Sequence, residues 1–206
     1  MLSDKIIQLI VRAYRKKINL FNCFGIPVYI GIGFILGTFL LLIILVYATD
    51  KYYPGPRTSN LFFSSFTLCL IIQAALFSAI LIHELGHAYF IRKNNFQVDY
   101  IYISAIYGIC TYTYYEDEEP PTIIAYGGIL AQIPFAIAIW IVLRMVDYEH
   151  APYDSYLRNF SVIWTFLSAS LFIHTLMIVV NLFPFPGLDG EKIFKHLEEI
   201  MRRRRS

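Results

Sequence analysis

The sequence predicts an all-α polytopic membrane protein with about four transmembrane helices and a small membrane-associated β-hairpin or sheet. Of its 206 residues, 57% are hydrophobic and only 16% are charged, whereas soluble domains contain about 25% charged residues. Charged residues are absent from four long stretches, each of which can hold the ~20 apolar residues that cross a bilayer. These stretches are 18–49, 58–82, 120–143 and 159–188.

The predicted helices give a simple domain organisation. The first apolar segment is too long for the core of a signal peptide, so it is counted as a span. The connections are too short for an independent soluble domain. We expect an N-terminal amphipathic, cytoplasmic segment at 1–23, a membrane domain at 24–197 and a basic cytoplasmic tail at 198–206. The four spans are expected near 29–49, 64–92, 122–145 and 160–183.

Lysine and arginine concentrate in the two terminal segments and in the connection between the second and third spans. Because cytoplasmic loops carry an excess of these residues, both termini and this connection are expected in the cytoplasm. The arginines at 202–205 are interpreted as a topology signal and a lipid contact, not as a nucleic-acid site. The frequent use of Ile, Lys, Asn and Tyr hints at an AT-rich microbe, so the integral membrane protein that the apolar spans predict is expected in a microbial plasma membrane.

The run His83-Glu84-Leu85-Gly86-His87 lies inside the second predicted span. On a helix, residues four apart share one face, with Cβ atoms about 6 Å apart, so the two imidazoles can bind one Zn²⁺. Glu84 then lies beside the metal as a general base. Ionisable groups at the centre of a membrane cost at least ~2.5 kcal/mol each, and a bound metal would compensate that cost. Gly86 would let another element pack closely against this helix.

Catalytic zinc needs a third protein ligand, and Asp189 is the candidate. It follows the fourth span in a stretch broken by Pro184, Pro186 and two glycines. Such a stretch is also what a plain helix exit looks like. The second and fourth spans run in the same direction, however, so Asp189 and the histidine pair are expected on the same, cytoplasmic side of the membrane.

Together these motifs resemble the site-2 protease family of intramembrane zinc metalloproteases. That family pairs HExxH on one span with N-x-x-P-x-x-x-L-D-G on a later one, which corresponds here to Asn181, Pro184 and the run Leu188-Asp189-Gly190. The resemblance implies that His83, His87 and Asp189 bind one zinc ion and that Glu84 is the catalytic acid/base. It extends from about residue 20 to 197 and describes a minimal member, without a PDZ or CBS domain.

Two shorter segments extend the resemblance. FGIPV at 24–28 is similar to the family's G-I-P-V segment, and GGILAQ at 127–132 is similar to its A-G-P-L-A-N segment. Gln132 replaces the usual Asn, and Ile129 stands where Pro is common. Gln132 and Asn181 are therefore candidates for holding substrate or the oxyanion. For Gln132 the alternative is a structural amide that is hydrogen-bonded to a neighbouring helix.

The connection at 97–115 has the composition of β-strands, with Val, Ile, Thr and Tyr around Gly108. We expect a hairpin that, together with the segment at 26–29, presents a sheet edge to an extended substrate. The alternative is a plain hairpin at the membrane surface. The acidic run at 116–119 is interpreted as a solvated turn, and the stretch at 3–17 as an amphipathic helix on the membrane surface.

The resemblance implies a zinc metalloendopeptidase that cuts peptide bonds in or next to transmembrane segments, in regulated intramembrane proteolysis or in clearance of signal-peptide remnants. Its substrates would be single-span membrane proteins or signal peptides, and it would lie in the lipid bilayer. A regulatory membrane protein or a second copy of the chain could be a further partner. Nucleic acid is not expected as a partner. The alternatives are a catalytically silent zinc-containing factor that binds membrane proteins and, less favoured, a metal transporter.

The remaining histidines and cysteines carry no chemical prediction. His174 is interpreted as a buried structural histidine, too far along its helix from Asp189 to be an obvious ligand. The three cysteines fit no zinc or disulfide spacing. Of these, Cys110 is the one expected near the site.

Overall fold

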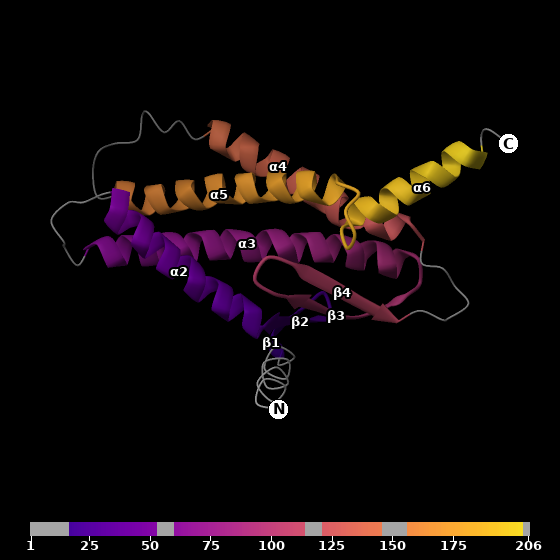
Figure 1. Cartoon of the computed structure of the whole chain (residues 1–206), viewed down its shortest axis with the longest axis horizontal. Helices are drawn as coiled ribbons and strands as arrows, with labels where there is room; N and C mark the ends of the chain where they lie inside the picture. The colour runs from indigo at the N-terminus through magenta and orange to yellow at the C-terminus, as the bar shows by residue number, and fades with distance from the viewer. Residues whose placement is uncertain (1–16, 53–59, 114–120, 146–155, 204–206) are drawn as a thin grey trace, which may run out of the picture.

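The computed structural model describes residues 17–52, 60–113, 121–145 and 156–203 (Figure 1). Long helices lie side by side, and a small sheet packs near one end of them. The elements in chain order are β1 (Lys17–Cys23), β2 (Ile26–Gly31), α2 (Ile32–Tyr52), α3 (Asn60–Lys93), β3 (Gln97–Ile103), β4 (Gly108–Thr113), α4 (Ile123–Met145), α5 (Tyr156–Leu182) and α6 (Asp189–Arg203).

Three of these helices are long and apolar enough to cross a bilayer: Ser65–Lys93 of α3, α4, and Val162–Leu182 of α5. The described apolar part of α2, Ile32–Ala48, is shorter than those three. The expected polytopic helical architecture is therefore present with three candidate spans, and the fourth span remains a prediction.

The sheet has the strand order β1-β2-β3-β4. Its two outer pairs are antiparallel, and the central pair, β2 with β3, is parallel. A parallel pair requires a long crossover, which α2 and α3 supply here. The expected hairpin at 97–115 is present as β3 and β4. The segment at 26–29, expected to help form an edge, instead lies in the interior strand β2, so that β1 and β4 form the edges.

Several expected boundaries differ from the structure. The first helix begins at Ile32 and not at 29, because residues 29–31 complete β2. Residues 17–23, assigned to an amphipathic segment, form the strand β1. The boundary expected at 197 falls inside α6, which continues to Arg203. The rest of the expected N-terminal helix and the acidic run at 116–119 lie outside the described residues.

The β1–β2 turn explains why the sequence does not predict strand β1. Cys23 pairs with Ile26, so that Phe24 and Gly25 form a two-residue loop, with φ of 49° and 75°. Tight hairpin turns with positive φ at both positions favour Asn or Asp followed by Gly. A bulky residue with positive φ is uncommon, so Phe24 hides the turn signal that Gly25 supplies.

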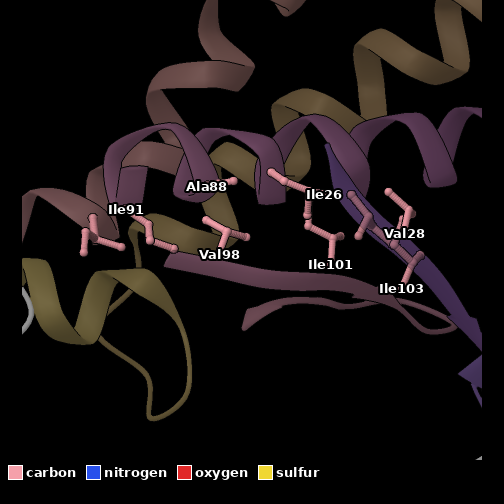
Figure 2. Packing of buried hydrophobic residues seen from close by; sticks show 9 residues of the cluster. Ile26, Val28, Ala88, Ile91, Val98, Ile101 and Ile103 are labelled. Carbon is pink, nitrogen blue, oxygen red and sulfur yellow. The ribbon is translucent and has the colours of Figure 1, made fainter. Parts of the chain in front are cut away.

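The apolar core lies between the sheet and α3 (Figure 2). Val28 of β2 and Ile101 of β3 are fully buried and belong to one cluster with Ile91 and Ala88 on α3. The sheet is thereby fixed along the half of α3 that carries the histidine motif.

On another side of α3, Gly86 packs against Gly127 of α4. A Cβ on Gly86 would overlap the Gly127 carbonyl, and a Cβ on Gly127 would lie 2.6 Å from the Gly86 oxygen. The two backbones touch only because neither residue has a side chain. This contact confirms that Gly86 allows close packing of another element.

Candidate metal centre

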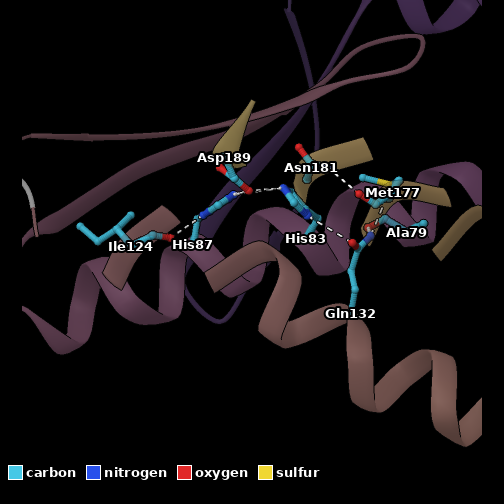
Figure 3. A network of polar contacts seen from close by, with 8 residues as sticks. All are labelled: Ala79, His83, His87, Ile124, Gln132, Met177, Asn181 and Asp189. Atoms are coloured by element: carbon cyan, nitrogen blue, oxygen red, sulfur yellow. Dashed lines mark hydrogen bonds and ion pairs between the residues drawn. The ribbon is translucent and has the colours of Figure 1, made fainter. Parts of the chain in front are cut away.

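His83 and His87 lie one turn apart on α3, and both side chains are largely buried. Their Nε2 atoms are 3.1 Å apart. Asp189, the first residue of α6, brings Oδ2 to 3.1 Å from His83 Nε2 and 3.2 Å from His87 Nε2. The structure thus brings together the three expected ligands, and Figure 3 shows them facing one point.

The loop before α6 directs Asp189 toward this point. Gly187 has φ of +88°, a left-handed conformation that glycine adopts without strain, and its N–H donates to the Glu191 carboxylate at 3.1 Å. Gly190 packs on the backbone carbonyl of Phe183, where a Cβ would not fit. The start of α6 is therefore folded tightly back onto the end of α5, with Asp189 directed at α3.

The outer nitrogen of each imidazole fixes its tautomer. His87 Nδ1 lies 2.8 Å from the carbonyl oxygen of Ile124, which can only accept, so Nδ1 carries the proton. His83 Nδ1 lies 3.4 Å from Gln132 Oε1. The Gln132 amide is oriented by its NH₂ group, which lies 3.4 Å from the Ala79 carbonyl. In the neutral tautomer that these contacts favour, each ring presents an unprotonated Nε2 on the side of Asp189.

These donor atoms fit a zinc ion. Two bare imidazole nitrogens and a carboxylate oxygen would repel one another without a cation, and Asp189 Oδ2 is buried without a hydrogen-bond partner among the described residues. Ligand atoms at ~2.0–2.1 Å from a tetrahedral zinc lie about 3.3 Å apart, close to the separations of 3.1–3.2 Å found here. Hydrogen bonds from outer groups to metal-binding histidines are also usual.

Asp189 supplies the negative charge. Burial alone would raise the pKa of its carboxyl group, but when the two imidazoles carry protons, their hydrogen bonds and charge outweigh burial and lower the pKa to about 2; a bound cation in their place would favour the carboxylate in the same way. Asp189 is therefore a carboxylate throughout the neutral range, as a metal ligand must be.

Glu84 is placed beside the ligands but is not one of the three converging groups. Its side chain lies against Gly108 at the start of β4, where a Cβ would be 2.6 Å from Glu84 Oε1. The backbone N–H of Cys110 hydrogen-bonds with the Glu84 carboxylate. Strand β4 therefore holds the expected acid/base group in position.

A cavity of about 590 Å³ adjoins the three ligands and Glu84. Its walls come from α3, β4, α4, α5 and α6, and they include the run 106–110 at the start of β4. Cavities of this size hold small ligands or a short peptide segment. The three candidate ligands and Glu84 therefore share one cavity between the described helices and β4.

The two expected amides occupy different positions. Asn181 lines the cavity and donates to the Met177 carbonyl at 3.0 Å. Gln132 is fully buried and contacts His83, Ala79 and Met177. This position favours the structural interpretation of Gln132, as an amide that orients His83, while the substrate role of Asn181 stays a prediction.

Two supporting residues were not identified from the sequence. A Cβ on Gly128 would overlap the His83 imidazole, so this glycine of α4 makes room for the ligand ring. Ile124 orients His87 through its backbone carbonyl, a contact that no side-chain pattern can reveal. In the sequence, the adjacent glycines at 127 and 128 were the available signal for close packing on α4, since each lets a neighbouring group approach the helix backbone.

Two other residues that can bind metals lie apart from this group. His174 is buried, and its ring stacks on Phe135 with centroids 6.3 Å apart. Cys110 lines the cavity, but burial and the nearby Glu84 carboxylate raise the pKa of its thiol to about 12. The thiol therefore stays protonated at neutral pH and is a poor nucleophile.

The fold of the chain is similar to that of a solved structure, the site-2 protease from Methanocaldococcus jannaschii. The two share 21% sequence identity with a TM-score of 0.51, and the match covers 88% of this chain and 71% of the other. This chain has the fold of a site-2 protease. No protein-family model and no curated protein matches the sequence. This similarity establishes the fold and agrees with the motif resemblance. The chemistry is inferred from the residues of this chain.

Proposed function

We propose that this chain is an intramembrane zinc metalloendopeptidase of the site-2 protease type. The observation that carries the proposal is the convergence of His83, His87 and Asp189 on one point, with Glu84 held beside them in a shared cavity. A histidine pair, a third ligand and an adjacent glutamate are the parts that metal-dependent peptide hydrolysis requires.

The chemistry divides between the metal and the protein. When bound, zinc would act as a Lewis acid on the scissile carbonyl and on the attacking water. Glu84 accepts a proton from that water and later donates it to the leaving amine nitrogen. The Cys110 N–H and Gly108 hold the Glu84 carboxylate against β4, so the base needs little reorganisation during the reaction.

The substrate is expected to bind as an extended strand along β4. On one side β4 pairs with β3, and it is an edge strand of the sheet. Its first residues, Gly108 to Cys110, also line the cavity that contains Glu84. Strand addition would hold a peptide through main-chain hydrogen bonds regardless of its side chains. This suits a single-span membrane protein or a signal peptide whose helix unwinds locally.

The orientation in the membrane belongs to the same proposal. Arg92 and Lys93 end α3, and two arginines end α6, and basic residues favour the cytoplasmic side. The termini and the metal centre are then expected at the cytoplasmic face of a microbial plasma membrane.

The deciding experiment compares Glu84→Gln with the parent. Both are purified in detergent, loaded with zinc and assayed for cleavage of a single-span substrate. Loss of the acid/base group should lower the rate by about 10²–10⁴-fold, while zinc affinity stays near that of the parent. The matched control is Glu198→Gln on exposed α6, which should cleave normally.

Equal cleavage by Glu84→Gln and the parent would show that Glu84 is not the base. A parent that binds zinc but cuts nothing would instead favour a silent binding factor.

A further inference from the structure

Helix α6, which begins with Asp189, has one apolar face that the rest of the described chain covers only in part. Ile193 is buried against Ala125 and Ile129 of α4. Farther along the same face, Phe194, Leu197 and Met201 remain 45%, 42% and 52% exposed. The spacing of these residues at one, four and eight positions after Ile193 keeps them on a single stripe. We refer to Phe194, Leu197 and Met201 as the exposed stripe.

The opposite side of α6 is charged. Lys195 pairs with Glu191 at 2.7 Å, with both groups toward solvent. The end of the helix is basic, with Arg202 and Arg203 in its last turn, and the sequence continues with two further arginines. An amphipathic helix with a basic end is typical of segments that bind the surface of an anionic bilayer.

The position of α6 also favours a bilayer as the occupant of the exposed stripe. The candidate span Val162–Leu182 ends shortly before α6 begins, so α6 starts near a membrane face. Figure 1 shows it leaving the bundle at the end where α3 terminates. A second copy is a weaker choice, because a helix of 15 residues offers only about two heptads for pairing.

We propose that α6 binds the anionic bilayer surface through the exposed stripe and its basic end, and that this contact keeps Asp189 at the metal centre. Asp189 and Met201 belong to one helix, about 18 Å apart along its axis. The buried residues of α6, Gly190 and Ile193, both lie among its first five residues, so the described part of the chain fixes the start of the helix more firmly than its later turns. Binding of the stripe to lipid then limits the motion of the helix that supplies one ligand.

Only the coupling of α6 to Asp189 rests on the proposed metal centre. The binding of α6 to lipid has a test of its own. The full chain, with Cys23, Cys69 and Cys110 replaced by Ala, receives a spin label at Met201→Cys or, as the matched control, at Glu198→Cys. Each is reconstituted in phosphatidylcholine vesicles with and without phosphatidylglycerol. In anionic vesicles the Met201 label should be accessible to oxygen and the Glu198 label to a water-soluble nickel reagent.

Water accessibility of both labels in anionic vesicles would overturn the lipid contact. Strong dipolar broadening at Met201 alone would show that a second copy covers the stripe, and this too would overturn it.

The coupling to Asp189 is tested by zinc competition against a chromophoric chelator, in the same vesicles and with the native cysteines. The double variant Leu197→Glu/Met201→Glu should bind zinc about tenfold more weakly than the parent, the scale of losing a supporting contact to a metal ligand. Glu198→Gln should match the parent. Unchanged zinc affinity in the double variant would overturn the coupling. Absence of zinc binding by the parent would instead reject the proposed metal centre, while the spin-label result would still report on α6.

Discussion

At the scale of single residues, each histidine ligand depends on the partner of its second nitrogen. His87 donates to a backbone carbonyl, that of Ile124, which no substitution can delete. His83 faces a side chain, Gln132, at 3.4 Å. Gln132 is therefore the residue at which the tautomer of a ligand can be changed by mutation. Its two other contacts, with Ala79 and Met177, hold the amide so that its oxygen faces His83.

Replacement of Gln132 by Leu should weaken zinc binding by about 10–100-fold, because the acceptor for His83 Nδ1–H is lost. Gln73→Leu is the matched control, since Gln73 is also a largely buried glutamine, on α3, whose Nε2 has no partner among the described residues. Chelator competition measures both affinities. If the two variants bind zinc equally well, Gln132 does not orient His83.

At the scale of elements, strand β4 connects the acid/base group to the substrate edge. Gly108 is the point of contact, because a Cβ there would lie 2.6 Å from Glu84 and 2.7 Å from Ile80. Neither neighbour can move away easily, since both side chains are buried. The position of Glu84 beside β4 thus requires a residue without a side chain at 108.

Gly108→Ala should therefore displace the Glu84 carboxylate and lower kcat by about 10²-fold, within the range that a general acid/base contributes. Zinc affinity should stay close to that of the parent, because the atoms nearest to a Cβ at 108 belong to Glu84 and Ile80 and not to the three candidate ligands. Single-turnover cleavage together with a zinc titration separates the two effects. A variant with parental kcat would show that β4 does not position Glu84.

At the scale of the whole molecule, the metal centre joins elements that are distant in the chain. His83 and His87 belong to α3, whereas Asp189 begins α6. A metal that binds only when these helices are in place stabilises the folded state by about 4 kcal/mol at a free concentration 1,000 times its Kd. The centre is thus expected to contribute to stability as well as to chemistry.

Removal of zinc with a chelator should accordingly lower the Tm of the purified protein, and zinc should restore it. His87→Ala should remove this response, because only two of the three candidate ligands, His83 and Asp189, would remain to bind zinc. Magnesium provides the control, since it prefers oxygen ligands and water and should leave the Tm unchanged. Equal melting with and without zinc in the parent would contradict a metal that links α3 to α6.

The sequence by itself located the candidate ligands and the order of the apolar helices. Both depend on local patterns: residues four apart share one face of a helix, and the length of an apolar run reports its ability to cross a bilayer. The histidine pair, Glu84 and the strand-rich connection could therefore be located without a structure. Asp189 could be proposed as a ligand because the apolar span before it, α5, is predicted to cross the membrane in the same direction as α3.

Only the tertiary structure decided how these parts support one another. The pairing of β1 and the interior position of β2 are contacts between distant strands, and strand formation depends strongly on such neighbours. Gln132 could be interpreted as a substrate amide or a structural one until the position of His83 was known. The roles of Gly108 and Gly128 likewise appear only once Glu84 and His83 are seen to fill the space that a side chain would take.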